Sequence, residues 1–172
     1  TIDAKGLVVA PGFIDGHQHC LEPYAYRFML RDGRTTIMDL EIGAHGPKLN
    51  EWYKRHEGNT SVNYGVAVAH EFARAEVLDG FTDWKYLYTP DAVKSREKDG
   101  WSKTRPTLEQ VNEILSLLDE GLRQGGIGIG STVGCAREYR LAKFTNCRNC
   151  PDFMDARSVC IFVTLPELIP KK

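Results

Sequence analysis

The stretch Pro11–Cys20, "PGFIDGHQHC", decides how this sequence is interpreted, because an apolar run ends there in two histidines one residue apart. We expect Phe13 to Gln18 to form a buried β-strand. Side chains at positions i and i+2 of a strand point to the same face, so Asp15, His17 and His19 would share one face. Two imidazoles at that spacing can converge on one divalent ion. The alternative is that the two histidines are only polar residues that close a strand.

The composition is that of a globular domain. The chain has 172 residues, of which 42% are hydrophobic and 26% charged, and this length suits one domain with a real core. Its 22 basic and 23 acidic residues nearly cancel, and no apolar run approaches the ~20 residues of a membrane helix. We therefore expect neither a nucleic-acid nor a membrane partner; the oligomeric state is unknown from sequence. Four of the five cysteines crowd into the tail, which favours a reducing compartment and predicts a cytoplasmic location.

Strand-like and helix-like stretches alternate four times. Expected strands cover residues 13–18, 35–42, 61–70 and 126–131, and expected helices cover 24–33, 48–58, 71–78 and 106–126. In the last helix, Thr107 and Gln110 form a capping-box pattern. An apolar stripe follows it, made of Val111, Ile114, Leu115, Leu118 and Leu122. The glycines of the fourth strand predict that another element packs closely against it. This alternation predicts an α/β fold with a parallel sheet or barrel.

The stretch "GLVVAPGFIDGHQH" resembles the opening of the amidohydrolase superfamily barrel. Three later stretches agree in order, "GRTTIMDLEIG", "VNYGVAVAHEFARAEVL" and "LDEGLRQGGIGIGSTVG", and the N-acyl-D-amino-acid deacylase branch is the closest form. The resemblance covers Thr1 to Gly134. It implies a partial TIM-type (β/α) barrel containing about the first four β/α units. Residues 1–10 would end a small β domain, 11–134 would be the N-terminal half of the barrel, and 135–172 would be a divergent tail, truncated or out of register.

The resemblance also implies a site. His17 and His19 fall on the metal ligands of the first strand, and the intact family holds one or two divalent ions, here expected to be zinc. A cysteine ligand of the deacylase branch falls on Ile42, which cannot bind metal, so Glu41 is the available substitute. The alternative for Glu41 is a solvated carboxylate at a strand end. His70, at the end of the third strand, is a candidate for substrate binding or an ordinary hydrogen-bonded histidine, and no catalytic base is assigned.

Two further histidines are expected to lie outside the site. We interpret His45, in a loop just past the second strand, as an ordinary hydrogen-bonded histidine. We interpret His56 as a solvated residue at a helix end.

The function implied by the resemblance is metal-dependent hydrolysis of amide bonds in N-acyl amino acids, which are small-molecule substrates. One alternative is a cyclic-amide hydrolase of the dihydroorotase or hydantoinase type, which shares the first motif. Another is a non-catalytic truncated fragment, because all five histidines lie at or before His70 and the later ligands of the family have no counterpart here.

Overall fold

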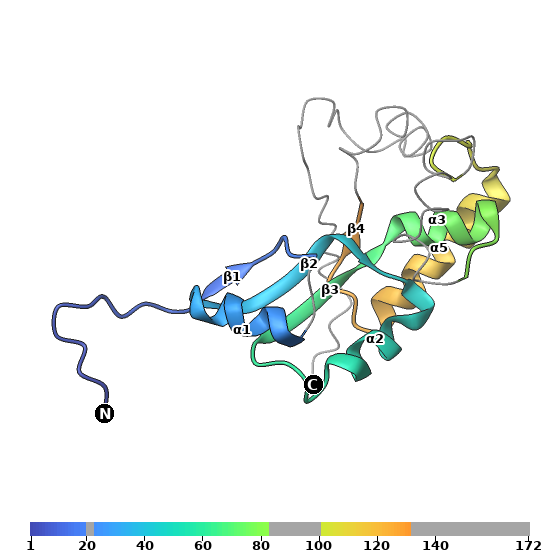
Figure 1. The fold of residues 1–172 in the computed structure, drawn as a ribbon. Helices are drawn as coiled ribbons and strands as arrows, with labels where there is room; N and C mark the ends of the chain where they lie inside the picture. Colours follow the sequence, from blue (N-terminus) through green and yellow to red (C-terminus); the bar gives the residue numbers. More distant parts are fainter. Residues whose placement is uncertain (20–22, 83–100, 132–172) are drawn as a thin grey trace, which may run out of the picture.

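Four parallel strands form the sheet of the computed structural model, which describes residues 1–19, 23–82 and 101–131. The strands lie side by side in chain order, β1-β2-β3-β4, and each pairs in parallel with the next (Figure 1). Their bounds are Phe13–Asp15 for β1, Arg34–Ala44 for β2, Asn63–Ala69 for β3 and Ile129–Gly130 for β4. The predicted parallel α/β sheet is therefore confirmed. A closed or partial barrel remains a prediction.

Helices connect the strands, as parallel pairing requires. They are α1 (Pro23–Arg31), the short 3-10 helix η1 (Gly46–Lys48), α2 (Leu49–His56), α3 (His70–Asp79) and α5 (Leu108–Arg123). Gly33, just after α1, has a φ of 80°, the left-handed conformation that a side chain disfavours and that commonly ends helices. The expected helices all occur, with ends displaced by a few residues.

Helix α5 is fixed at its start by the predicted capping box. The Thr107 side chain accepts a hydrogen bond from the Gln110 backbone N–H, and the Gln110 side chain accepts one from the Thr107 backbone N–H. Ile114 and Leu118 of the apolar stripe are buried. Leu115 of the predicted stripe is 55% exposed, because a residue adjacent to Ile114 lies about 100° round the helix and points away from the sheet.

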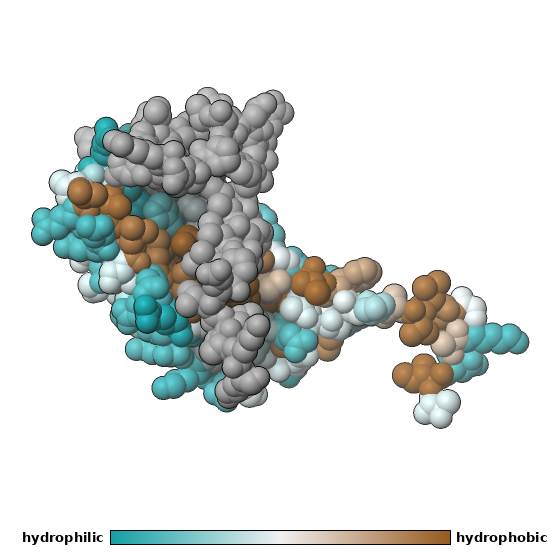
Figure 2. Space-filling model, turned by 180° about the vertical axis from the view of Figure 1, so that it is seen from behind, coloured by the Kyte–Doolittle hydropathy of each residue, from teal (hydrophilic) through white to brown (hydrophobic). Residues whose placement is uncertain are grey.

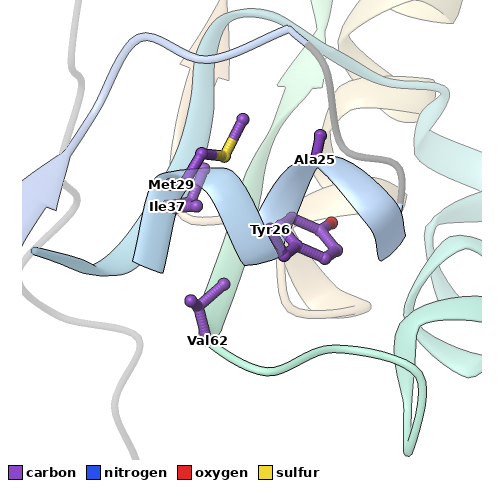
Figure 3. Packing of buried hydrophobic residues seen from close by; sticks show 5 residues of the cluster. All are labelled: Ala25, Tyr26, Met29, Ile37 and Val62. Carbon is purple, nitrogen blue, oxygen red and sulfur yellow. The ribbon is translucent and has the colours of Figure 1, made fainter. Parts of the chain in front are cut away.

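The core forms where these helices cover the sheet. Val68 of β3 packs with Ala73 of α3 and with Ile114 and Leu118 of α5. Under α1, a second cluster joins the helix to β2 (Figure 3); its members are Ala25, Tyr26, Met29, Ile37 and Val62. Both clusters bury apolar surface between a helix and the sheet, and such burial stabilises the folded chain by about 25 cal/mol per Å².

Glycine allows the close approach around β4 that the sequence predicted. A Cβ at Gly126 would lie 2.4 Å from a Val68 methyl group, and one at Gly130 would lie 2.6 Å from the Glu41 carbonyl oxygen. Neither distance is possible for real atoms. These glycines therefore let β3, β4 and the end of β2 pack together.

Strand β1 is short and exposed, which corrects the predicted buried strand over residues 13–18. It ends at Asp15, and Phe13 and Ile14 are 65% and 69% exposed. The reason is its place at the edge of the sheet, where the described residues cover only its β2 side. Edge strands of this kind leave backbone and apolar groups unpaired.

The segment before β1 extends away from the sheet and carries exposed apolar side chains (Figure 2). These include Ile2, Leu7, Val8 and Val9. Whether residues 1–10 end a small β domain stays a prediction, and the expected tail, 135–172, lies outside the described residues. None of the described helices combines the length and apolarity of a membrane span.

Candidate metal centre

The centre begins with an irregularity in β2. Asp39 pairs with Val66 of β3, but the next paired residue, Ala44, faces Val68. Between these two pairs strand β2 advances by five residues while β3 advances by two, so three extra residues of β2 bulge out of the regular ladder. Bulges of this type redirect side chains and are frequent beside functional sites. Here the bulge carries Glu41.

Asp39 holds this bulge in place. Its Oδ1 accepts hydrogen bonds from three successive backbone N–H groups, those of Glu41 (3.2 Å), Ile42 (2.9 Å) and Gly43 (3.2 Å). Gly43 has a φ of 82°, and a Cβ there would lie 2.5 Å from the Ala67 carbonyl oxygen. The bulge therefore depends on an acceptor at Asp39 and on the absence of a side chain at Gly43.

The two histidines reach the same point from β1. The strand ends at Asp15, and the His17 backbone N–H donates to the Asp15 carboxylate at 3.1 Å. His17 then forms an isolated antiparallel bridge with Asp39, and the Gln18 N–H donates to the Met38 carbonyl at 3.1 Å. The chain after β1 is thus attached to β2 beside the bulge.

Asp15 is itself held by Arg34, which donates to it at 2.9 Å. Burial alone would raise the pKa of the Asp15 carboxyl, but the hydrogen bonds from Arg34 and the His17 N–H, with the nearby positive charges, lower that pKa below its usual 3.8. Asp15 is therefore an ionised anchor for the turn that leads to His17.

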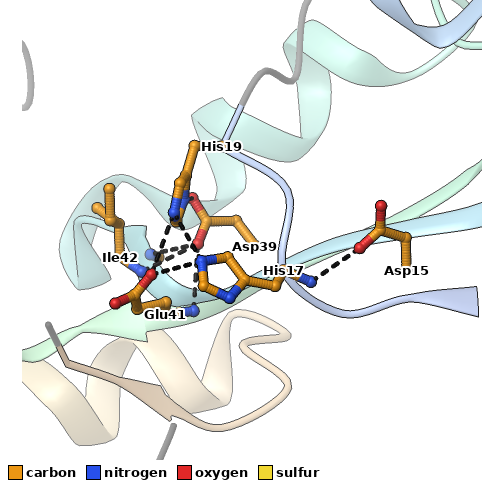
Figure 4. Close-up of polar contacts among 7 residues, drawn as sticks. Asp15, His17, His19, Asp39, Glu41 and Ile42 are labelled. Carbon is orange, nitrogen blue, oxygen red and sulfur yellow. Dashed lines mark hydrogen bonds and ion pairs between the residues drawn. The ribbon is translucent and has the colours of Figure 1, made fainter. Parts of the chain in front are cut away.

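Three ligand atoms converge beside the bulge (Figure 4). The Nε2 atoms of His17 and His19 lie 3.1 Å apart. The Glu41 Oε2 lies 2.7 Å from the His17 Nε2 and 3.1 Å from the His19 Nε2. Among the described residues, these three form the one group of histidine, cysteine or carboxylate side chains whose geometry could hold a metal ion.

This triangle fits a divalent ion. Bond lengths of about 2.0–2.1 Å in a tetrahedral zinc site place neighbouring ligand atoms roughly 3.3 Å apart. Two of the separations, at 3.1 Å, are close to this value, and the third, 2.7 Å between His17 and Glu41, is shorter. Two imidazole nitrogens and one carboxylate oxygen are suitable zinc ligands, and a set of three leaves a fourth position open. The His17 side chain is 58% exposed and that of Glu41 20%, so a small molecule can approach from the His17 side.

A surface groove adjoins the cluster at His17. It has a volume of about 590 Å³ and runs along β1; it is lined by Phe13, Ile14, Asp15, Gly16, His17, Asp32 and Arg34. Because His19 and Glu41 do not line it, the groove reaches one corner of the cluster only.

The structure brings together all three predicted metal ligands, although their binding of metal remains a prediction. Ile42, at the position of the cysteine in the deacylase branch, instead packs against the apolar cluster around Ala69 and Phe72. His70 is the first residue of α3 rather than the last of β3. It is not part of the three-residue cluster, and its role in substrate binding is likewise still a prediction.

His45 and His56 differ in outcome. The His45 Nε2 contacts the Glu76 carboxylate, as expected of a hydrogen-bonded histidine, whereas its Nδ1 is buried without a partner among the described residues. His56 does end α2, as predicted, but it is half-buried rather than solvated. Its ring stacks on Trp52 with centroids 3.9 Å apart, and its Nδ1 donates to the Trp52 carbonyl at 2.7 Å. Residues four apart on a helix are neighbours, which explains the stack.

Asp39 is the residue of the centre that the sequence reading missed. It is 3% exposed, and its Oδ2 lies 3.3 Å from the His19 Nδ1. The apolar and β-branched residues of "TTIMDLEI" predict a strand and draw no attention to Asp39. The available signal is the i, i+2 spacing of Asp39 and Glu41, which places two carboxylates on one face of that strand.

Comparison with known proteins gives a relative for part of the chain. A D-hydantoinase of Streptomyces coelicolor (strain ATCC BAA-471 / A3(2) / M145) is 35% identical over 93 residues, covering 45% of this chain and 20% of the relative. The chain resembles the amidohydrolase superfamily. It spans about a fifth of the length of this curated relative, and no family model matches the sequence.

Two solved structures of D-aminoacylase resemble part of the backbone of this chain. One is described as a study of the functional role of its binuclear metal centre, and the other as a mutant in complex with copper chloride. Each is 20% identical and covers 74% of this chain and 28% of its own, with TM-scores of 0.49 and 0.47. At these values the two likenesses bear on neither the chemistry nor the metal of this chain.

Proposed function

We propose that His17, His19 and Glu41 form the metal site of an amidohydrolase that cleaves amide bonds in N-acyl amino acids. The observation that carries the proposal is the convergence of three ligand atoms within 3.1 Å of one another. Similarity to a D-hydantoinase supports the broader class of amide hydrolases. Zinc is the expected ion because nitrogen and oxygen ligands in a three-donor set suit it.

Each residue has a separate task in this proposal. The neutral rings of His17 and His19 donate nitrogen lone pairs, and Glu41 contributes the negative charge that offsets part of the charge of a divalent ion. When bound, the ion would supply Lewis acidity that polarises an amide carbonyl and activates water. The exposed side of His17 and the groove beside it leave room for substrate. We assign no general base, so metal binding is the first claim to test and hydrolysis the second.

A cyclic-amide substrate is the second candidate, favoured by the name of the D-hydantoinase relative. Both substrates contain an amide carbonyl, so the three proposed ligands do not distinguish between them. The substrates differ in the leaving amine, which stays attached to the product when a cyclic amide is opened. Only assays with both classes of substrate separate the two.

The first experiment measures metal content. The 172-residue chain is stripped with a chelator, reloaded with zinc and dialysed, and zinc is counted by mass spectrometry. We expect one zinc per chain. His17→Ala and Glu41→Gln should each lower zinc affinity by more than about 100-fold, because loss of a ligand should cost more than loss of a residue that only hydrogen-bonds to a ligand. Glu51→Gln, a change to an exposed carboxylate on α2, is the matched control and should bind zinc normally.

The second experiment supplies N-acetyl-D-amino acids and hydantoins to the zinc-loaded chain. Hydrolysis of the N-acyl substrates, lost in His17→Ala, supports the proposal. Opening of hydantoins alone favours the cyclic-amide candidate. Zinc bound without turnover of either substrate identifies a metal-binding chain that lacks catalysis, and failure to bind zinc overturns the metal site itself.

A further inference from the structure

We propose that Asp39 is the positioning residue of this centre, and that one carboxylate sets both the ring orientation of His19 and the place of Glu41. Its importance for metal affinity rests on the proposed function. Its effect on the hydrogen position of His19 does not, and can be measured without metal.

Both carboxylate oxygens of Asp39 have hydrogen-bond partners. Asp39 is 3% exposed, and burial of a carboxylate is costly unless hydrogen bonds replace the lost water. Oδ1 takes three backbone N–H groups from the bulge. Oδ2 faces the Nδ1 of His19 at 3.3 Å. The buried charge is thus compensated by the bulge on one side and by a metal-ligand candidate on the other.

The contact with Oδ2 favours hydrogen on the His19 Nδ1, because an ionised carboxylate can only accept. The Glu41 Oε2, 3.1 Å from the His19 Nε2, favours hydrogen on the opposite nitrogen. A zinc ion bound at Nε2, or removal of the Glu41 charge, leaves the Asp39 contact to place the hydrogen on Nδ1. The Nε2 lone pair is then the one available toward His17 and Glu41, whose atoms both lie 3.1 Å away. A carboxylate behind a metal-binding histidine fixes the ring and increases its basicity in this way.

The contact with Oδ1 places the third ligand. The three N–H groups belong to successive residues, so they form a concave backbone segment around one oxygen. Glu41 is the first of these residues, and the direction of its side chain follows from that segment. Without an acceptor at position 39 the segment would expose three unsatisfied N–H groups.

Asp39→Asn separates the two contacts of this carboxylate, because an asparagine side chain accepts hydrogen bonds at its oxygen but donates them at its nitrogen. The asparagine carbonyl can still accept the three N–H groups, and they prevent the amide from turning over, since a turned amide would present its NH₂ to three donors. The amide NH₂ must therefore face the His19 Nδ1 and donate to it. The hydrogen of His19 is then favoured on Nε2, where it competes with metal binding.

The first measurement is the hydrogen position itself. Long-range ¹H–¹⁵N spectra of metal-free Glu41→Gln, in which no carboxylate faces the His19 Nε2, report which ring nitrogen carries hydrogen. In Glu41→Gln the His19 Nδ1 should carry hydrogen, and in the double variant Glu41→Gln, Asp39→Asn it should lose it. A purely structural role of Asp39 would not produce this exchange. A bare Nδ1 in Glu41→Gln overturns the proposal, whether or not the double variant folds.

The second measurement is zinc affinity, by competition with a chromophoric chelator. Asp39→Asn should weaken binding by about 10- to 100-fold, the usual effect of removing a partner behind a ligand. Asp119→Asn, which removes an exposed charge beside Arg123 on α5, is the matched control and should leave affinity unchanged. Normal affinity in folded Asp39→Asn overturns the positioning role, whereas absence of zinc binding in the unmodified chain contradicts the proposed function and leaves the spectra to decide about Asp39.

Discussion

The Nε2 atoms of His17 and His19 lie 3.1 Å apart, although strand β1 ends two residues before His17. Their meeting therefore does not come from regular strand geometry. It comes from two attachments of the segment after β1, one to the Asp15 carboxylate and one to the Met38 carbonyl. The stability of these attachments sets how well the two rings are held before any ion binds.

The attachment at Asp15 should depend on pH. The pKa of Asp15 is lowered in the folded chain, so its contribution to stability is present above the unfolded pKa and disappears as pH falls through the lower folded value. Asp15→Asn should cost about 1 kcal/mol near neutral pH, and the difference from the unmodified chain should shrink below about pH 4. Urea unfolding at a series of pH values measures this. A difference that persists unchanged into strong acid would contradict it.

Gly43→Ala should distort the bulge. The φ of 82° and the 2.5 Å approach to the Ala67 carbonyl both oppose a side chain, and we expect a loss of about 1–3 kcal/mol in the free energy of unfolding. Zinc affinity should fall as well, because Glu41 lies two residues away on the same bulge. Gly58→Ala, with a φ of 73° and open space around it, isolates the conformational cost of about 1 kcal/mol. Equal losses in the two variants would show that the contact with Ala67 is unimportant.

Gly121→Ala should reverse the usual preference for alanine in helices. Replacing an exposed helical glycine by alanine gains about 1 kcal/mol, but here a Cβ would lie 2.6 Å from a Val68 methyl group and 2.7 Å from the Gly46 Cα. Overpacking of this kind costs about 1–3 kcal/mol, so denaturant titration should give net destabilisation. Gly128→Ala, which meets nothing within 4 Å, should be neutral or slightly stabilising. A stabilised Gly121→Ala would mean that α5 can move away from β3.

Thr107→Ala should weaken the start of α5. It removes the side chain that accepts the Gln110 N–H, and loss of such a cap costs about 1 kcal/mol. Thr107→Ser retains the hydroxyl and should behave almost as the unmodified chain in thermal unfolding. If serine and alanine were equally destabilising, the hydroxyl would not be the stabilising group.

Local signals account for the part of the fold that the sequence predicts. The capping box at Thr107 and Gln110 depends on residues three apart, and the alternation of strands and helices depends on short stretches, so both are visible in the chain itself. The exposure of Phe13 and Ile14 is different. It depends on which strand lies at the sheet edge, and that is a property of the assembled sheet.

The candidate site divides in the same way. The i, i+2 spacing led to the expectation that His17 and His19 would meet, although the segment after β1, rather than a strand, brings them together. Glu41 is the nearest carboxylate to a position where isoleucine cannot bind metal. The bulge between Asp39 and Ala44 could not be predicted, because an irregular register exists only relative to β3. The two contacts of Asp39 follow from that bulge, so its role became visible only in three dimensions.

The excursion between Asp39 and Ala44 separates the third ligand position from the hydrogen-bond ladder on either side. A different donor side chain at position 41 would change the charge and hardness of the ligand set while β2 and β3 kept their alignment. If the proposed site binds metal, position 41 is accordingly a place where its metal preference can be altered independently of folding.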